Sequence, residues 1–330
     1  KVRYQAFSGS LKPVVALAHH QNDQIESFFL SVLRGGGVRG MVAMPFVRRL
    51  NNKILWRPLL NISRQQIEKY AQIHQLAFIE DPTNSDTNYT RNYLRHVWLP
   101  EIAPRIPHFA QQIESNIKQL QHSLAIIDEV ADSDLQAVSV NPHTLDLAQW
   151  ALLSAPRRLE VLYLLIKNNQ LQMPERRCLW TFAQQLFRQP ENYAELKIKN
   201  IAFEQRDGGQ DFDSGLYAQY GFLWAVTGFS GSLNAEWHSD KKGLSDEIIS
   251  TLTCRRVHKR DTIRTQIGHK SVWKLLQEKK IPQFIRRHWL VWVDSHNQCV
   301  AVTNLRCDET LAVPNGKMPK VEALRCFQAA

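Results

Sequence analysis

Long apolar runs are missing from this sequence. A helix that crosses a bilayer needs about 20 consecutive apolar residues, whereas stretches such as 28–33 and 161–166 are short and flanked by charged side chains. We therefore expect no membrane-spanning helix. With 44% hydrophobic and 22% charged residues in 330, the composition is typical of a folded globular protein with two or three domains, and it excludes disordered and collagen-like chains.

Paired cysteines are missing too. The five cysteines are scattered, with no Cys-x-x-Cys pair and no histidine at zinc-ligand spacing. This pattern favours a reducing, cytoplasmic compartment. The chain starts at Lys1 rather than at methionine, with no basic, apolar and small-residue leader, so we expect its natural N-terminus to be missing. The cysteines are Cys178, Cys254, Cys299, Cys307 and Cys326.

Positive charge is concentrated at the two ends of the chain. Residues 1–105 carry 14 basic and 7 acidic side chains, residues 106–253 carry 12 and 18, and residues 254–330 carry 15 and 6. The three blocks therefore have net charges of +7, −6 and +9, and a charge of +9 in the last block is more than solubility alone requires. Because each lysine or arginine near a phosphate releases bound counterions, this distribution favours a polyanionic partner such as a nucleic acid.

Apolar patterning predicts an α/β fold at the start of the chain. The run 14–18 has the pattern of a buried strand in a parallel sheet, and a helix follows with apolar residues at helical spacing from Ile25 to Leu33. Gly35–Gly37 ends that helix. A second step places a strand at 54–56.

The next helix and strand follow from local signals. A capping box at 63–66 opens a helix that we expect to bury Ile67, Tyr70 and Ala71, and the chain then returns as a strand at 77–79. These elements predict a parallel-sheet domain with helices between its strands.

Long helices and then short strands follow. Apolar spacing predicts helices around 109–127 and 159–166, and glycines with alternating aromatic residues between 208 and 231 predict short strands or loops. A basic helix at 271–280 and a hairpin of strands 289–293 and 299–303 form the last block. We predict four segments: 1–105, part of an α/β domain; 106–230, mainly helical; 231–253, a linker; and 254–330, a basic domain that binds a polyanion.

The run His20-Gln-Asn-Asp23-Gln-Ile-Glu26 lies where a strand gives way to a helix, the edge at which α/β sheets bind nucleotides. Asp23 there can bind Mg²⁺ or an amine, His20 can exchange protons or contact phosphate, and the helix N-terminus favours anions. A structural alternative stays open, because Asp23 and Glu26 are also spaced as an N-cap and its N3 partner.

Two further motifs allow either a functional or a structural interpretation. The loop Arg34-Gly35-Gly-Gly37 brings amides and a guanidinium to a phosphate, or it is a helix C-cap. Arg91 and Arg95 are four residues apart on one helical face, where they bind phosphate or carboxylate, or form a solvated surface. Between them, Glu80-Asp-Pro-Thr-Asn84 is either a turn or a pair of acids that binds an ammonium group.

These motifs, in this order and together with Arg57-Pro-Leu-Leu60 and Gly268-His-Lys270, resemble the tRNA(Ile)-lysidine synthase family of PP-loop ATPases. The resemblance spans nearly the whole chain and is weaker through the helical middle. It implies that ATP activates C2 of the wobble cytidine of an isoleucine tRNA with a CAU anticodon as an adenylate. The ε-amine of L-lysine then displaces AMP.

The resemblance also implies roles for single residues. His20, Asp23 and Glu26 are expected to be catalytic, with Asp23 near Mg²⁺ or the amine, and Arg34, Gly35 and Gly37 to line the ATP site. By the same resemblance Arg91 and Arg95 are expected to meet phosphates, segment 1–105 to be part of the nucleotide-binding domain, segment 106–230 to bind substrate or tRNA, and segment 254–330 to bind tRNA. The basic groups of that last segment add Lys270, Lys274, Arg286 and Arg287 as expected tRNA-binding residues. A homodimer is compatible with these expectations, and no membrane partner is expected.

The sequence departs from the family pattern at two points. Asn22 replaces the first acid of the usual His-x-Asp-Asp motif, which leaves Asp23 as the expected carboxylate. The Ser-Gly-Gly-x-Asp-Ser loop that holds the ATP phosphates does not occur in these 330 residues, and Phe7-Ser-Gly-Ser10 lacks its second glycine and its aspartate. Two alternatives to an active ligase therefore stay open: a tRNA-binding fragment without the ATP loop, and a related adenylating enzyme that thiolates tRNA, against which the absence of Cys-x-x-Cys pairs argues.

Without that loop, we expect these 330 residues alone to bind ATP weakly or not at all, because the backbone amides that hold the phosphates are missing. Calorimetric titration with ATP and Mg²⁺ measures this directly. Binding in the low micromolar range would contradict the prediction.

Overall fold

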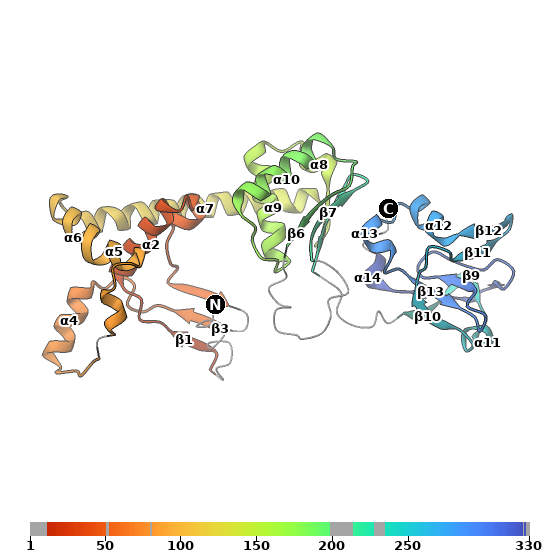
Figure 1. Cartoon of the computed structure of the whole chain (residues 1–330), viewed down its shortest axis with the longest axis horizontal. Helices are drawn as coiled ribbons and strands as arrows, with labels where there is room; N and C mark the ends of the chain where they lie inside the picture. Colours follow the sequence, from red (N-terminus) through yellow and green to blue (C-terminus); the bar gives the residue numbers. More distant parts are fainter. Residues whose placement is uncertain are drawn as a thin grey trace. The chain divides into compact units, whose positions relative to one another are not determined.

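The computed structural model describes residues 12–50, 53–79, 81–198, 214–227, 235–325 and 327. The chain divides into two compact units, residues 1–129 and residues 130–330 (Figure 1). The run Phe7–Ser10, Glu80 and the glycines at 208, 209, 228 and 231 lie outside the described residues. Among those described, no helix combines the length and the apolar character that a bilayer crossing requires.

Unit 1 is built on a three-stranded sheet with the order β1-β3-β2. Strand β1 (Val14–Ala16) pairs in parallel with β3 (Lys53–Trp56), as the apolar pattern predicts, and β2 (Val47–Leu50) pairs antiparallel with β3. Leu55 at the centre of β3 is fully buried. Helix α2 (Gln21–Leu33) follows β1 directly and ends at Arg34, after which Gly35 adopts a φ of 66°. The strand, its parallel pairing, the helix and the glycine stop predicted here are confirmed, but the expected burial of the strand is wrong, because Val14 is 45% exposed.

Two expectations for the second α/β step are wrong. Helix α4 (Arg64–Ile73) begins with the predicted capping box between Ser63 and Gln66, but it has no buried residue, and Tyr70 is 59% exposed. Ile67 and Ala71 are only partly buried. Residues 77–79 form no strand, and Ile79 is 97% exposed. The apolar spacing defines a face on α4, but within the described residues no element covers that face.

Short helical segments connect this sheet to a long helix. They are η1 (Pro82–Ser85), α5 (Thr90–Tyr93), the π-helical turn η2 (Leu94–Trp98), α6 (Leu99–Ile102) and η3 (Ala103–Arg105), and the long helix is α7 (Phe109–Val138). A further short helix, α3 (Gly37–Met41), lies between α2 and β2. Phe29 of α2 stacks on Phe109 at the start of α7, with 6.0 Å between ring centroids, and Trp98 meets Phe29 edge-on at 4.9 Å. These aromatic contacts hold α2 against the start of α7.

Unit 2 contains a five-stranded antiparallel sheet with the order β4-β5-β8-β7-β6. Three helices, α8, α9 and α10, pack on one face of it around the buried side chains Trp150, Leu162 and Leu216 (Figure 1). The helix predicted at 159–166 is confirmed as part of α9. The elements are β4 (Ser139–Asn141), β5 (Thr144–Asp146), α8 (Leu147–Ala151), α9 (Ala155–Asn168), α10 (Arg176–Arg188), β6 (Ala194–Lys197), β7 (Gly215–Gln219) and β8 (Phe222–Val226).

The C-terminal part of unit 2 forms three small sheets around a second core. The predicted hairpin is confirmed as β13 paired with β14, and the predicted basic helix as α12. Trp289 is fully buried, and its Nε1 donates to the carbonyl of Thr303 at 3.0 Å. The elements are β10 (Thr253–Arg256), β11 (Thr262–Thr265), β12 (Gly268–Ser271), α12 (Val272–Glu278), α13 (Gln283–Arg286), β13 (Leu290–Val293), β14 (Cys299–Val302), β15 (Arg306–Cys307), β16 (Val313–Pro314), β17 (Lys317–Lys320) and α14 (Glu322–Arg325).

The segment predicted as a linker, 231–253, differs from that expectation in part. Within it, β9 (Glu236–Leu244) pairs with both β16 and β17, and α11 (Asp246–Ile249) follows. Trp237 on β9 meets Trp292 on β13 edge-on, at 4.8 Å between ring centroids. These residues are therefore part of the C-terminal fold. The other domain boundaries stay a prediction.

Gly215, at the start of β7, lies so close to β6 that substituting it tests the pairing register of these two strands. Gly215 has a φ of 158°, and a Cβ added there would lie 2.4 Å from the carbonyl oxygen of Leu196 on β6. Gly268 also has a positive φ, of 122°, but open space around it. We expect Gly268→Ala to cost about 1 to 3 kcal/mol of stability through backbone strain, and Gly215→Ala to cost more than about 3 kcal/mol because steric overlap is added. Urea unfolding of both variants measures the difference, and equal losses would contradict the strand register.

Candidate functional site

The N-terminus of α2 places the first group of predicted residues. His20 is the N-cap, and its backbone N–H donates to Asp23 Oδ2 at 3.0 Å. Asp23 therefore does help to cap the helix, as the structural alternative proposed, but from the N3 position and not as the N-cap residue. One oxygen of Asp23 helps to cap the helix and the other points away from this contact, so capping accounts for only half of the carboxylate.

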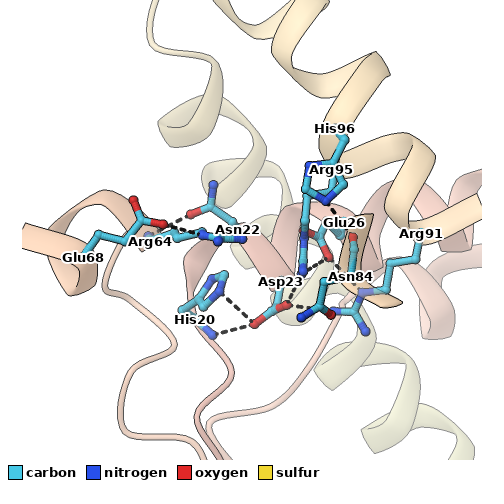
Figure 2. A network of polar contacts seen from close by, with 10 residues as sticks. All are labelled: His20, Asn22, Asp23, Glu26, Arg64, Glu68, Asn84, Arg91, Arg95 and His96. Atoms are coloured by element: carbon cyan, nitrogen blue, oxygen red, sulfur yellow. Dashed lines mark hydrogen bonds and ion pairs between the residues drawn. The ribbon is translucent and has the colours of Figure 1, made fainter. Parts of the chain in front are cut away.

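The second oxygen of Asp23 joins a cluster of two carboxylates and two guanidinium groups (Figure 2). Asp23 Oδ1 accepts hydrogen bonds from Nη2 of Arg91 at 2.8 Å and from Nη2 of Arg95 at 3.0 Å. Glu26 Oε2 accepts from Nε of Arg91 at 2.8 Å and from Nη2 of Arg95 at 2.9 Å. Glu26 Oε1 accepts from Nε of Arg95 at 2.6 Å. The structure thus unites two motifs that are more than sixty residues apart in the sequence.

Burial is unequal among the four side chains. Glu26 is 1% exposed, Asp23 10%, Arg95 20% and Arg91 43%. Bonds from the Arg95 guanidinium to Glu26 outweigh its partial desolvation and raise the pKa of Arg95. Because an unpaired charge at the depth of Glu26 would be strongly unfavourable, the two arginines are needed as its counter-ions.

The arginines are held in place by an irregular helix. Arg95 lies in the π-helical turn η2, a conformation that is rare and frequent at functional sites. Asn92, between the two arginines, donates through Nδ2 to the carbonyls of Thr83 and Asp86, both at 2.9 Å. His96 Nε2 lies 2.8 Å from the carbonyl oxygen of Asn84. The 81–86 turn therefore supports the arginine helix.

Asp81, the one acid of the 80–84 motif that lies within the described residues, is not part of the cluster. Asp81 Oδ1 accepts from the backbone N–H of Thr83 at 2.9 Å and from its hydroxyl at 2.7 Å. The hydroxyl bond from Thr83 is the main cause of a lowered pKa for the Asp81 carboxyl. Of the two interpretations of this segment, the geometry matches turn formation.

His20 is the group nearest to the cluster that can exchange a proton near neutral pH. Its Nε2 lies 3.4 Å from Asp23 Oδ2, and its buried Nδ1 has no hydrogen-bond partner among the described residues. Burial lowers the pKa of the imidazole below 6.5, and the neighbouring carboxylates of Asp23 and Glu26 only partly offset this effect. The ring is therefore neutral at pH 7 and able to accept a proton.

A cavity of about 480 Å³ lies beside the cluster. Asn22, which replaces an expected acid, accepts from the backbone N–H of Arg64 at 3.0 Å and so links α2 to the start of α4 (Figure 2). Polar groups and an apolar wall together line the cavity, an arrangement typical of small-ligand sites. The lining includes Asn22, Ile25, Glu26, Arg64, Arg95, His96, Leu99 and Phe109.

The glycine loop lies at the other end of α2. Arg34 is the C-cap, and Gly35 and Gly37 both have positive φ, of 66° and 59°. Because Asp23 lies ten residues before Leu33, the last residue of α2, and a helix rises about 1.5 Å per residue, about 15 Å of helix separates this loop from Asp23. The structure therefore does not bring Arg34, Gly35 and Gly37 together with the ion cluster.

The predicted basic residues of the C-terminal block differ in exposure. Lys274 and Arg287 are exposed, and Lys270 is partly exposed and forms an ion pair with Glu278. Arg286 is a correction: it is 6% exposed, and its guanidinium donates to the carbonyl of Ile281 at 2.8 Å and to the hydroxyl of Tyr220 at 2.6 Å. These bonds hold it inside the protein, away from any phosphate.

Two features of the site were missed from the sequence. One is the pairing of Asp23 and Glu26 with Arg91 and Arg95, although acids three apart and arginines four apart on helices were a usable signal. The other is Gln24, whose amide bonds both the carbonyl and the N–H of Met44, at 2.8 and 2.7 Å. In the sequence, this contact between Gln24 and the backbone of Met44 is indicated only by the position of Gln24 inside the 20–26 motif.

Comparison with known proteins identifies the relatives of this chain. Residues 1–102 match the family model of the PP-loop domain, which confirms the predicted nucleotide-binding fold and implies the use of ATP. A tRNA(Ile)-lysidine synthase of Neisseria gonorrhoeae is 36% identical over 337 residues, which cover 96% of this chain and 73% of the relative. One of Chromobacterium violaceum is 30% identical over 339 residues, covering 97% and 76%.

A third relative matches a shorter part more closely. The tRNA(Ile)-lysidine synthase of Proteus mirabilis is 40% identical over 149 residues, 44% of this chain and 34% of the relative. The resemblance seen in the motifs therefore extends over the whole chain at substantial identity. This chain belongs to the tRNA(Ile)-lysidine synthase family.

Proposed function

We propose that this protein ligates L-lysine to C2 of the wobble cytidine of an isoleucine tRNA with a CAU anticodon, at the expense of ATP. The observation that carries the proposal is the cluster of Asp23, Glu26, Arg91 and Arg95 at the strand-to-helix edge of a PP-loop domain. Such a ligation must gather a cationic amine and anionic phosphates at one place, and this cluster has groups of both signs.

The chemistry has two steps. The C2 oxygen of cytosine attacks the α-phosphorus of ATP, which releases pyrophosphate and leaves an adenylated base. The lysine ε-amine then attacks C2, the C–O bond breaks, and AMP departs with the oxygen. In the first step negative charge develops on phosphate, where the guanidinium groups of Arg91 and Arg95 stabilise it. In the second step the amine loses a proton, and neutral His20 is placed to accept it.

Asp23 and Glu26 are proposed to bind the ammonium group of lysine before it reacts. Two carboxylates side by side provide several acceptor oxygens for one ammonium group, once that group takes the place of an arginine donor. Arg34, Gly35 and Gly37 stay a prediction for the ATP site, at a distance from this lysine position.

A resident Mg²⁺ ion does not fit the cluster. All four of its carboxylate oxygens already accept N–H donors, and within the described residues no three His, Cys, Asp or Glu side chains come together as a metal site. Mg²⁺ belongs to this proposal as the ion carried by the phosphates of ATP, and no step is assigned to it through Asp23.

The surroundings of the described cysteines, as well as their spacing in the sequence, disfavour the alternative of a tRNA-thiolating enzyme. Burial raises the pKa of Cys299 and of Cys307 to about 12, so neither thiol is a nucleophile at neutral pH. Cys178 and Cys254 are exposed and lie on separate elements, α10 and β10. We further propose a cytoplasmic location, while a homodimer stays a prediction.

In a full-length version that carries the Ser-Gly-Gly-x-Asp-Ser loop, Asp23→Asn is expected to lower lysine incorporation into tRNA by about 100-fold or more, because the amide keeps the helix-capping acceptor but loses the charge that binds the ammonium group. Asp81→Asn is the matched control, since Asp81 also caps a helical turn but lies outside the cluster; it is expected to retain near-normal activity. Thermal melting of both variants is measured in parallel. Normal incorporation by a folded Asp23→Asn variant would remove Asp23 from the reaction, whereas a complete lack of incorporation by the unsubstituted protein would favour the tRNA-binding-fragment alternative.

The basic C-terminal surface is proposed to bind tRNA through phosphate contacts. Lys274→Ala and Arg287→Ala are each expected to weaken tRNA binding and to lower the salt dependence by about one phosphate contact. Lys69→Ala, an exposed residue of α4, is the control with the same charge change. Filter binding over a range of salt concentrations measures the slope.

These substitutions are preferable to deletion of residues 254–330. Strand β9 pairs with β16 and β17, so a deletion would expose β9 and confuse misfolding with lost binding. If tRNA affinity is independent of salt, or unchanged in both C-terminal variants, the C-terminal block is not the tRNA-binding surface.

A further inference from the structure

The guanidinium of Arg91 lies where a ligand cation would have to bind. Its Nη2 is 2.8 Å from Asp23 Oδ1, and its Nε is 2.8 Å from Glu26 Oε2, so it bridges the two carboxylates. An ammonium group donates the same kind of charge-assisted bond to the same oxygens. A side chain of the protein thus fills the position assigned above to the ammonium group of lysine.

We propose that Arg91 is an exchangeable counter-ion: L-lysine binds by displacing its guanidinium from Asp23 and Glu26, and the displaced guanidinium binds the phosphates of ATP. The inference rests on the proposed function, because it concerns how lysine reaches the same two carboxylates. Its consequence is that lysine and the triphosphate strengthen each other's binding.

Charge balance requires the exchange. Asp23 and Glu26 contribute two negative charges, and Arg91 and Arg95 contribute two positive charges, so the cluster is neutral. Adding an ammonium group without releasing an arginine would leave a net positive charge next to Glu26, which is 1% exposed. An uncompensated charge at that depth is strongly unfavourable. Replacement of one cation by another keeps the cluster neutral.

The contacts identify Arg91, not Arg95, as the group that leaves. Arg95 makes three hydrogen bonds to the carboxylates and is 20% exposed, whereas Arg91 makes two and is 43% exposed. Arg91 lies on α5, a helix of only four residues, and Arg95 lies inside the π-helical turn. Arg91 therefore has fewer bonds to lose and open solvent into which its side chain can turn.

A displaced guanidinium needs a new anion, and the second substrate supplies one. Arginine binds phosphate oxygens in a bidentate manner. If the triphosphate stabilises Arg91 in the outward position, it lowers the free energy of lysine binding, and by linkage lysine strengthens triphosphate binding by the same factor. The resting ion pairs therefore keep the lysine position closed until phosphate is present.

Isothermal titration of L-lysine into the wild-type chain and into Arg91→Ala, without nucleotide, tests the exchange. Removal of the internal competitor is expected to strengthen lysine binding by about tenfold or more. Arg105→Ala is the control: it removes the same charge from the same unit, but Arg105 pairs only with Glu101 on the surface, at 3.6 Å. Its lysine affinity is expected to match that of the wild type. Arg91→Gln serves as a second variant if circular dichroism shows that the alanine variant does not fold.

A second titration adds inorganic tripolyphosphate as the anion probe. It is expected to strengthen lysine binding to the wild-type chain by about fivefold or more and to leave the Arg91 variants unchanged. Equal lysine affinity in the wild type and in a folded Arg91 variant overturns the exchange, as does the absence of lysine binding in both. A wild-type chain indifferent to tripolyphosphate overturns the phosphate coupling.

The same titration on Asp23→Asn separates this inference from the proposed function. If Asp23→Asn abolishes lysine binding while Arg91→Ala leaves it at the wild-type level, Asp23 binds lysine but Arg91 does not compete with it. If Asp23→Asn binds lysine as the wild type does, the assignment of the carboxylates to lysine is itself wrong.

Discussion

The carboxylate of Glu26 is almost completely removed from water, and the segment that carries Arg91 and Arg95 is arranged to balance its charge. A charge at that depth is tolerated only with close counter-ions and several hydrogen bonds. Arg91 and Arg95 provide both, which requires the segment 90–98 to lie against α2. Asn92 and His96 in turn fix the turn at 81–86 to that segment. One buried charge thus accounts for the placement of residues from three separated motifs.

The elements predicted correctly from the sequence are those whose signals are local. The strand at 14–16 and the helix with its glycine stop followed from apolar spacing and from Gly35, and the capping box at Ser63 followed from two side chains three residues apart. In each case the physical cause lies within one or two helical turns. Such causes can be read without knowing what packs against the element.

The errors have the opposite origin. The apolar spacing of α4 gives it a potential buried face, but burial depends on a partner element that the spacing does not specify, and Tyr70 is exposed. Arg286 has the same charge and nearly the same sequence surroundings as Arg287, yet Tyr220, sixty-six residues away, holds it inside the fold. The ion cluster was missed in the same way, since its two halves are on separate helices. Net charge therefore predicts which region can bind a polyanion, but it does not predict which single side chains of that region are exposed.

The C-terminal core shows why charge and tRNA binding cannot be assigned by segment alone. Tyr217 and Trp224 of the five-stranded sheet pack into the same core as Trp289, and Phe284 stacks on Tyr217 at 4.5 Å between ring centroids. The bonds from Arg286 to Tyr220 and from the N–H of Gln283 to Gln219 cross the same contact. In this basic block, part of the positive charge therefore joins α13 to β7 and β8, and only the exposed remainder, including Lys274 and Arg287, is available to a polyanion. Basic residues therefore serve both in the core and on the exposed surface of this block. The burial of each residue decides whether it stabilises the fold or can bind RNA.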